Sequence, residues 1–180
     1  MTELGHYIVV YGPTGSGKTT LAEQISQLIG VSHIELDEIF WQPGWVEKPL
    51  EEFRAEVSAV LSEHTDGWVM DGNYNRVRDL TLPLADTIIW WRPPYRVAFR
   101  RLLKRTVSRC RDGTLLWGTN YESWRKAFLS SDSLIIYQAA HWRAYGRIGK
   151  NFEEIPHRAK IIEFHSQKEI DAFLESLQGG

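Results

Sequence analysis

The chain has 180 residues and a formal net charge of −2, with 43% hydrophobic and 24% charged residues. This composition is typical of a globular protein, and we expect residues 1–180 to form a single domain with a sizeable core. The small net charge gives no reason to expect a nucleic-acid partner. The single cysteine, Cys110, excludes an internal disulfide and a zinc cluster made only of cysteines. No apolar run reaches the ~18 residues of a membrane helix and no signal sequence is recognisable, so we expect a cytoplasmic protein without a membrane partner.

The first predicted elements are a buried strand over 7–11, which ends at Gly12, and an amphipathic helix over 18–29, which ends before Gly30. The remaining elements are predicted in chain order: a strand over 33–36, a polar and aromatic loop over 40–45, a helix over about 50–61, strands over 68–70 and 87–91, a basic helix from about 95, a loop over 110–121, helical sequence over 122–145, a strand over 160–164 and a closing helix over about 170–177.

The alternation of strands and helices predicts an α/β domain in which a parallel sheet is covered by helices on both faces. Ligands of such sheets bind at the carboxyl ends of the strands. Three segments fall there: a glycine-rich loop after the first strand, Asp37 after the second and Asp71 after the third. We therefore expect the functional site at this edge of the sheet.

The loop between the first strand and the first helix matches the phosphate-binding pattern G-x-x-x-x-G-K-[ST] in full. Its residues are Gly12, Pro13, Thr14, Gly15, Ser16, Gly17, Lys18 and Thr19, followed by Thr20. Glycines let successive N–H groups point at one anion, and the helix N-terminus attracts the same anion. Lys18 would place positive charge on the β- and γ-phosphates, and Thr19 would offer a hydroxyl ligand to Mg²⁺. The loop predicts binding of ATP (or ADP) with Mg²⁺, and its glycine spacing disfavours a dinucleotide.

The two acids at strand ends fit the same chemistry. A carboxylate at this position can hold Mg²⁺, directly or through water, or accept the proton of a substrate hydroxyl group. Asp71 is followed by Gly72, which permits a ligand to approach the backbone closely. The alternative for each acid is a turn or helix-cap residue.

The predicted basic helix is unusual in a chain of small net charge. Its region contains eight basic residues without an intervening acid: Arg92, Arg96, Arg100, Arg101, Lys104, Arg105, Arg109 and Arg111. Arg101, Arg105 and Arg109 are spaced by four and share one face of a helix. Arginines can stack on a base or neutralise a transferring phosphoryl group. A solvated helix face and a nucleic-acid patch are the alternatives.

Taken in order, these landmarks resemble the adenylate kinase–shikimate kinase group of P-loop phosphotransferases. The sequence around Leu36-Asp37, at 40–45 and at 71–74 is most similar to bacterial adenylate kinase-like "DNA topology modulation" proteins. The resemblance implies a P-loop NTPase fold with three α/β/α layers and a five-stranded parallel sheet in the order 2-3-1-4-5.

The resemblance also implies roles for individual residues. Arg101 would pack on the adenine and Arg105 would reach the phosphates, with Arg109 or Arg111 as an arginine of a lid over 110–121. Asp71 would match the acid associated with Mg²⁺, and Asp37 the aspartate on the substrate side. Between Asp37 and Asp71 the chain lacks the arginine landmarks with which adenylate kinases read their acceptor, so the resemblance does not identify AMP as the acceptor.

We predict that the acceptor-binding segment spans 38–66. The candidate contacts with the acceptor are Trp41, Gln42, Trp45, Asn73 and Tyr74. Aromatic walls with a few amide groups suit a planar or sugar-like ligand. The alternative is a small hydrophobic core beneath the loop. Ser166 and Gln167, after the last strand, are candidates for the adenine edge, or Ser166 caps the closing helix.

The sequence thus predicts an ATP- and Mg²⁺-dependent phosphotransferase that acts on a small-molecule acceptor, as a monomer or homodimer. The predicted catalytic residues are Lys18, Asp37, Arg105 and Arg109. The alternatives are a nucleotide-gated regulatory or DNA-associated protein and a simple NTPase. Inward-facing Arg101 and Arg105 would favour the phosphotransferase over a DNA-associated protein.

Overall fold

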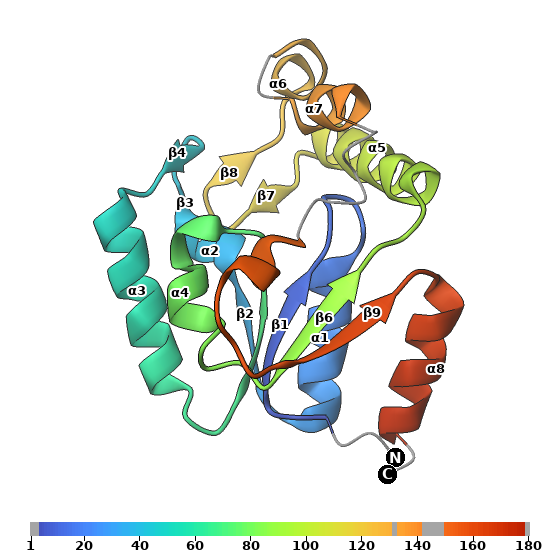
Figure 1. Cartoon of the computed structure of the whole chain (residues 1–180). Helices are drawn as coiled ribbons and strands as arrows, with labels where there is room; N and C mark the ends of the chain where they lie inside the picture. Colours follow the sequence, from blue (N-terminus) through green and yellow to red (C-terminus); the bar gives the residue numbers. More distant parts are fainter. Residues whose placement is uncertain (1–3, 131–132, 142–149, 179–180) are drawn as a thin grey trace.

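Five parallel strands form the central sheet of the protein, whose computed structural model describes residues 4–130, 133–141 and 150–178 (Figure 1). The strands of this sheet are β1 (Tyr7–Tyr11), β2 (Ser32–Glu35), β5 (Trp68–Asp71), β6 (Thr87–Trp91) and β9 (Lys160–Phe164). Their order is β2-β5-β1-β6-β9, and every neighbouring pair is parallel. Counted along the chain this is 2-3-1-4-5, so the predicted sheet and strand order are confirmed.

Continuous apolar runs explain the central strands. All five residues of β6 are buried, as are all four of β5. Strands that are buried on both faces lose the alternating pattern of a half-exposed sheet and consist of apolar residues throughout. β9 lies at the edge and leaves Ile161 44% exposed.

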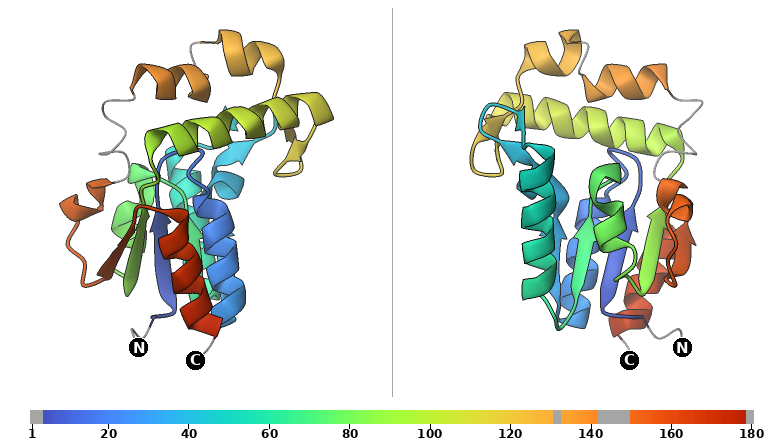
Figure 2. Two further views of the ribbon diagram at one scale, coloured as in Figure 1. Left: turned by 90° about the vertical axis from the view of Figure 1, so that its right-hand side faces the viewer. Right: turned by 60° about the vertical axis from the view of Figure 1, so that its left-hand side comes forward.

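Helices cover both faces of the sheet. One face packs against α1 (Lys18–Ile29) and α8 (Gln167–Gln178), which lie side by side (Figure 2). The other face packs against α2 (Leu36–Phe40), α3 (Leu50–Glu63) and α4 (Arg78–Thr81). Each face of the sheet has its own apolar cluster. The fold therefore has three layers, with the sheet between two layers of helices.

The helix α5 (Tyr95–Asp112) crosses the sheet at the carboxyl ends of the strands (Figure 1). Its buried residues are Ala98, Leu102 and Thr106, which are spaced by four. A Cβ atom placed on Gly15 would lie 2.5 Å from the Ala98 carbonyl oxygen and 2.8 Å from Leu102 Cβ. The helix therefore rests directly on the glycine-rich loop, and this contact requires a residue without a side chain.

The remaining elements are short. They are β3 (Trp41–Gln42) and β4 (Val46–Glu47), the 3₁₀ turns η1 (Asn75–Val77) and η3 (Lys150–Glu154), β7 (Leu115–Leu116) and β8 (Asn120–Tyr121), and the helices α6 (Trp124–Leu129) and α7 (Leu134–Ala140). β3 and β4 form one antiparallel hairpin, and β7 and β8 form another. Among the described residues, no helix combines the length and apolar character needed to cross a membrane.

The prediction of a loop over 110–121 is wrong. α5 continues to Asp112 and ends at Gly113, whose φ of 58° puts it in the left-handed conformation of a helix C-cap. The hairpin β7–β8 follows, with its turn at Trp117 and Gly118, which both have positive φ angles. Strands of two residues are too short to produce a recognisable alternation, so the sequence pattern did not reveal them.

Two smaller differences concern the predicted strand over 33–36 and the helical region over 122–145. The strand spans Ser32–Glu35, and Leu36 already begins the short helix α2. In the helical region, α6 and α7 are separate helices, and residues 142–145 lie outside the described residues. The N-caps Ser123 and Ser133, whose side chains accept backbone hydrogen bonds, explain where these two helices start.

We predict that Phe53→Ala lowers the free energy of unfolding by about 3–5 kcal/mol, because it empties a fully buried aromatic position. The ring centroid of Phe53 lies 5.0 Å from that of Phe40 and 5.3 Å from that of Tyr74. Urea unfolding measures the change. The control is Glu52→Ala on the exposed side of the same helix, which should change stability by no more than about 0.5 kcal/mol. Equal unfolding midpoints for the two variants would contradict the packing described above.

Candidate nucleotide and acceptor site

The glycine-rich loop joins the end of β1 to the start of α1. Gly15 and Gly17 have φ angles of 73° and 95°, a conformation that side chains strongly disfavour. The Ser16 N–H donates to the Pro13 carbonyl at 3.1 Å and closes a turn within the loop. α1 begins at Lys18 with no acid in its first turn, so its free N–H groups and positive dipole end are available to an anion. The predicted phosphate-binding loop therefore has the backbone shape and the helix N-terminus that the prediction requires.

The Ser16 carbonyl accepts two side-chain hydrogen bonds, which attach the glycine-rich loop to β6 and to α5. The indole N–H of Trp91 donates to it at 2.6 Å, and Arg101 Nη1 donates to it at 2.7 Å. Arg101 Nη2 also donates to Gln167 Oε1 at 2.9 Å. The arginine predicted to meet the adenine therefore lies inward, between the loop and the start of α8. Ser166 Oγ accepts a hydrogen bond from the Glu169 N–H at 3.3 Å. This contact is the one expected if Ser166 caps the closing helix, which was the alternative to its role at the adenine edge.

Asp71 lies at the centre of a hydrogen-bonded group of three side chains. Its side chain is 1% exposed. Its Oδ1 accepts a hydrogen bond from the Thr19 hydroxyl at 2.9 Å, and its Oδ2 lies 2.8 Å from His33 Nε2. Burial disfavours the charged imidazole of His33, but the hydrogen bond and charge of Asp71 outweigh it and raise the pKa of His33. The two residues predicted to hold a metal ion, Thr19 and Asp71, are thus in direct contact.

This pair of oxygens fits Mg²⁺. Magnesium in nucleotide sites is held by one or two protein oxygens together with phosphate oxygens and water. Within the part of the chain that the structure describes, no group of three or more His, Cys, Asp or Glu side chains is arranged to hold a metal ion. The hydroxyl of Thr19 and the carboxylate of Asp71 would therefore need the oxygens of a bound nucleotide to complete the coordination.

Asn73 has a neighbour that the sequence did not predict. Its Nδ2 donates to the Gly12 carbonyl at 2.6 Å, and its Oδ1 accepts the Gly12 N–H at 3.4 Å. The amide thereby pairs with the backbone at the start of the glycine-rich loop. Its observed contact supports the loop, and its predicted contact with an acceptor stays a prediction.

Asp37 and Tyr74 are paired. The Tyr74 hydroxyl donates to Asp37 Oδ1, and its ring packs 4.6 Å from that of Phe40. Burial, followed by the charge of Asp37 and this hydrogen bond, raises the pKa of Tyr74, so the phenol keeps its proton and remains a donor. One oxygen of Asp37 is therefore occupied by Tyr74, and the second is left for another partner.

The predicted acceptor loop is a hairpin whose tryptophans continue into the second hairpin. The ring centroids of Trp41 and Trp45 are 5.5 Å apart, and those of Trp45 and Trp117 are 5.6 Å apart, both edge to face. Trp45 has a φ angle of 64° and Trp117 one of 46°, rare values for bulky residues. The aromatic residues predicted near the acceptor therefore lie together with a tryptophan from the predicted lid.

Hydrogen bonds join the same two hairpins. The Trp45 N–H donates to Asn120 Oδ1 at 2.7 Å, and its indole donates to the Tyr121 carbonyl at 2.8 Å. Asn120 Nδ2 donates to the Gln42 carbonyl at 3.2 Å, and Asn120 is only 1% exposed. The buried side-chain amide of Asn120 both accepts and donates a hydrogen bond, and it thereby links the hairpin β3–β4 to the hairpin β7–β8.

The inner face of α5 carries Arg105 and Arg109. Arg109 Nη1 pairs with Glu122 Oε1 at 2.9 Å. Burial and the charge of Arg109 lower the pKa of Arg105, while Glu122, Asp37 and Glu35 act in the opposite direction. Among the described residues, the buried Nε of Arg105 has no hydrogen-bond partner. Arg105 therefore lies in the electrostatic field of the strand-end acids with unused donor capacity.

Arg111 lies apart from this group. Its side chain is 71% exposed, and it pairs with the adjacent Asp112 at 2.7 Å. The structure therefore brings Arg101, Arg105 and Arg109 to the inner face of α5, whereas Arg111 belongs to the surface.

Sequence reasoning missed four residues of this region: His33, Glu35, Trp117 and Asn120. The pKa of Glu35 is raised by burial and by the charges of Asp71 and Asp37, and is lowered in part by a hydrogen bond from Trp117. His33 and Glu35 could have been found, because alternate residues of β2 face the same side. Trp117 and Asn120 had no such signal, since their partners are distant in the chain.

No protein-family model matches the chain, and no curated protein matches its sequence. Solved structures of other proteins share its fold. A candidate kinase from Chloroflexus aurantiacus is 13% identical, with a TM-score of 0.51 and 96% of each chain covered. A sugar kinase from Janibacter sp. is 16% identical, with a TM-score of 0.53, covering 98% of this chain and 91% of that one. Shikimate kinase from Acinetobacter baumannii, in complex with shikimate, is 18% identical, with a TM-score of 0.51, covering 95% and 90%. At these identities, what the chain shares with them is the P-loop kinase-like fold.

Proposed function

We propose that this protein is an ATP-dependent phosphotransferase that moves the γ-phosphoryl group of ATP to a hydroxyl group of a small molecule. The observation that carries the proposal is the contact between Thr19 of the phosphate-binding loop and the buried carboxylate of Asp71. Phosphoryl transfer is catalysed chiefly by positioning and by charge neutralisation, and this edge of the sheet offers both. The kinases that share the fold agree with the proposal.

In this proposal the nucleotide lies over the glycine-rich loop. Residues 12–20 surround its phosphates, and Lys18 places its ammonium group on the β- and γ-phosphates. Arg101 and Gln167 would meet the base, and their hydrogen bond to each other beside Ser16 supports this role. Arginine stacks readily on a planar base, which suits Arg101 to the adenine.

Thr19 and Asp71 would hold Mg²⁺ together with phosphate oxygens. When bound, the ion would neutralise charge on the β- and γ-phosphates and hold them in line for transfer. The contribution of the protein is the fixed position of the two oxygens, of which the carboxylate is almost fully buried.

Asp37 is the proposed proton acceptor. Its oxygen that is not bonded to Tyr74 would take the proton of the acceptor hydroxyl as that oxygen forms its bond to the γ-phosphorus. The bond between the γ-phosphorus and the bridging oxygen breaks, and ADP leaves with the electron pair. Trp41 and Trp45, the candidate walls of the acceptor site, come from the hairpin directly after α2.

Arg105 and Arg109 are the proposed source of positive charge for the transferring group. The unpaired Nε of Arg105 gives it a donor for a phosphoryl oxygen. We further propose that residues 38–66 bind the acceptor and that 110–121 form a lid. The hydrogen bonds of Asn120 with Trp45 and Gln42 would then hold the lid against the acceptor-binding segment.

Two observations bear on the alternatives. Arg101 is turned inward onto Ser16, and the Nε of Arg105 is buried, so neither is offered to a DNA backbone. A simple NTPase would share the nucleotide site but would release ADP at a rate independent of any acceptor.

We predict that Lys18→Ala lowers ATP turnover at least about 100-fold, because the γ-phosphoryl group loses its lysine contact. ADP release in a coupled assay measures the change. Lys160→Ala, an exposed position at the start of β9, is the matched control and should keep wild-type turnover. Undiminished turnover by Lys18→Ala would refute the nucleotide site.

We predict that ADP release depends on an acceptor. The experiment is a screen with ATP and Mg²⁺ against nucleosides, nucleoside monophosphates, sugars and shikimate-like acids. With the acceptor that responds, Asp37→Asn should lower kcat about 10²–10⁴-fold while ADP affinity is retained, since only the proton acceptor is lost. The control Glu175→Gln, at an exposed position of α8, should leave kcat unchanged. Turnover that no acceptor accelerates would establish the simple NTPase instead.

A further inference from the structure

His33 is the one partner of Asp71 that has no part in the proposed function so far. It lies in β2, one of the two edge strands of the central sheet, and its Nε2 is 2.8 Å from Asp71 Oδ2. The exposed fractions of the two side chains are 21% for His33 and 1% for Asp71. A buried carboxylate is costly unless hydrogen bonds satisfy it, and His33 supplies one of the two that Asp71 receives from side chains.

The sheet register explains why these side chains meet. Glu35 of β2 lies opposite Asp71 of β5, and His33 lies opposite Val69. Val69 packs in the apolar cluster that includes α1, so Asp71, two residues later, faces α1 as well. His33 and Glu35 face the same side of β2, whereas Ile34 between them packs in the opposite cluster. Thr19, in the first turn of α1, completes the group from the helix.

We propose that His33 is a positioning residue for the nucleotide–magnesium site, an inference that rests on the proposed function. The Nε2–H of His33 holds Asp71 Oδ2, and this bond fixes the rotation of the carboxylate. Oδ1 is thereby kept on the Thr19 hydroxyl, where the two oxygens would hold the cation. Hydrogen bonds to the far oxygen of a metal-binding carboxylate orient it, and their loss typically costs 10–100-fold in metal affinity.

The chemistry of the surroundings supports this assignment. Burial, followed by the charge of Asp71, raises the pKa of Glu35, and like charges on the two carboxylates repel each other. Without the imidazole, Asp71 would be a buried anion beside a second acid, with only the Thr19 hydroxyl as a side-chain donor. The imidazole therefore supplies the second side-chain hydrogen bond that this buried carboxylate needs.

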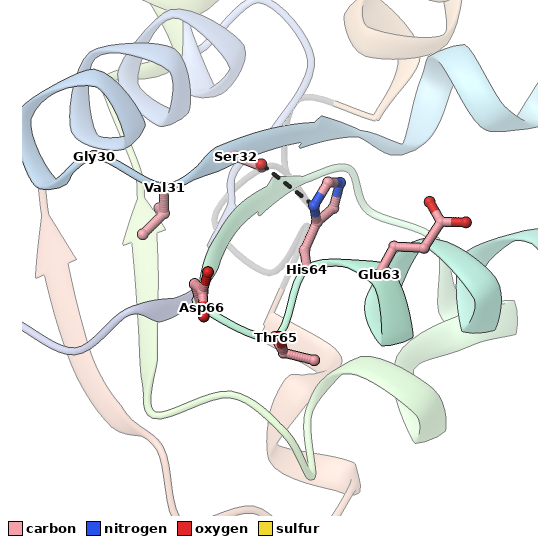
Figure 3. A pocket seen from close by; sticks show the side chains of 8 residues that line it. Gly30, Val31, Ser32, Glu63, His64, Thr65 and Asp66 are labelled. Carbon is pink, nitrogen blue, oxygen red and sulfur yellow. Dashed lines mark hydrogen bonds between the residues drawn. The ribbon is translucent and has the colours of Figure 1, made fainter.

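A matched control contacts the same strand from the end of α3. His64 lies 3.4 Å from the Oγ of Ser32, the first residue of β2. Figure 3 shows this pair in a surface hollow of about 380 Å³, lined by residues 30–32 and 63–67 at the end of β2 remote from Asp71. His64 belongs to the segment proposed for the acceptor, but it lies at the end of β2 away from Thr19 and Asp71. Its replacement therefore removes a histidine near β2 without touching the nucleotide–magnesium site, and the assay below contains no acceptor.

The experiment measures ADP binding by calorimetry over a series of Mg²⁺ concentrations and in EDTA. His33→Leu lacks the donor, and we expect it to need about 10–100-fold more Mg²⁺ for the half-maximal gain in ADP affinity, with unchanged affinity in EDTA. His33→Gln places an amide nitrogen near the position of Nε2, and it should stay within about threefold of wild type. His64→Leu should match wild type.

The outcomes separate the two proposals. Equal Mg²⁺ requirements for His33→Leu and wild type would overturn the role of His33 alone, as would a His33→Gln variant that is impaired as much as His33→Leu. If wild type bound no ADP at any Mg²⁺ concentration, the proposed function itself would fail. If His33→Leu does not fold, His33→Asn replaces it, because its amide is too short to reach Asp71 and it should show the same raised Mg²⁺ requirement.

Discussion

The buried carboxylate of Asp71 is the constraint on which the carboxyl edge of the sheet depends. A charge that is 1% exposed must be compensated, and its two side-chain partners come from two other elements, Thr19 from α1 and His33 from β2. Through Asp71, β5 is therefore hydrogen-bonded both to the neighbouring strand β2 and to helix α1. The glycine-rich loop begins at the end of β1, the neighbour of β5, so the backbone of the loop and the acid hold a constant relation to each other.

α5 adds a second constraint from above. Its backbone at Ala98 approaches Gly15 so closely that no side chain would fit, and its Arg101 bonds to the carbonyl of Ser16. The helix thus carries basic residues with two different surroundings. Arg101, Arg105 and Arg109 are turned toward the loop and the acids, whereas Arg96, Arg100 and Lys104 remain exposed. The run of positive charge that stands out in the sequence is therefore divided between a buried and a solvated face.

Most of the fold could be predicted, because the strands of the central sheet and the long helices have local signals. The apolar run of β6, the helical spacing of Leu21 and Ile25 and the glycine after α1 are all read within a few residues. The two hairpins could not be predicted in this way. Their strands have two residues each, and Asn120 holds them together through bonds to Gln42 and Trp45, far away in the chain.

The residues of the candidate site also fall into two groups, those with a local signal in the sequence and those placed by contacts between distant segments. The phosphate loop, Asp37 and Asp71 are marked by motif and strand position. Asn73 was expected beside an acceptor but pairs with Gly12, because its place depends on how the turn after β5 meets β1. His33 was overlooked because a histidine in a strand carries no motif: alternation along β2 places it on the side of Glu35, but its partner Asp71 belongs to the neighbouring strand.

The strand order has a consequence for how the chain is made. β1 is the first strand to be synthesised, yet it lies in the middle of the sheet between β5 and β6. Its backbone partners are complete only when the chain has reached Trp91, whose indole also anchors Ser16. A nascent chain that ends before β6 would therefore carry the whole phosphate-binding motif without its frame. The loop is encoded early and acquires its shape late, from strand pairings of high sequence separation that are intrinsically slow to form.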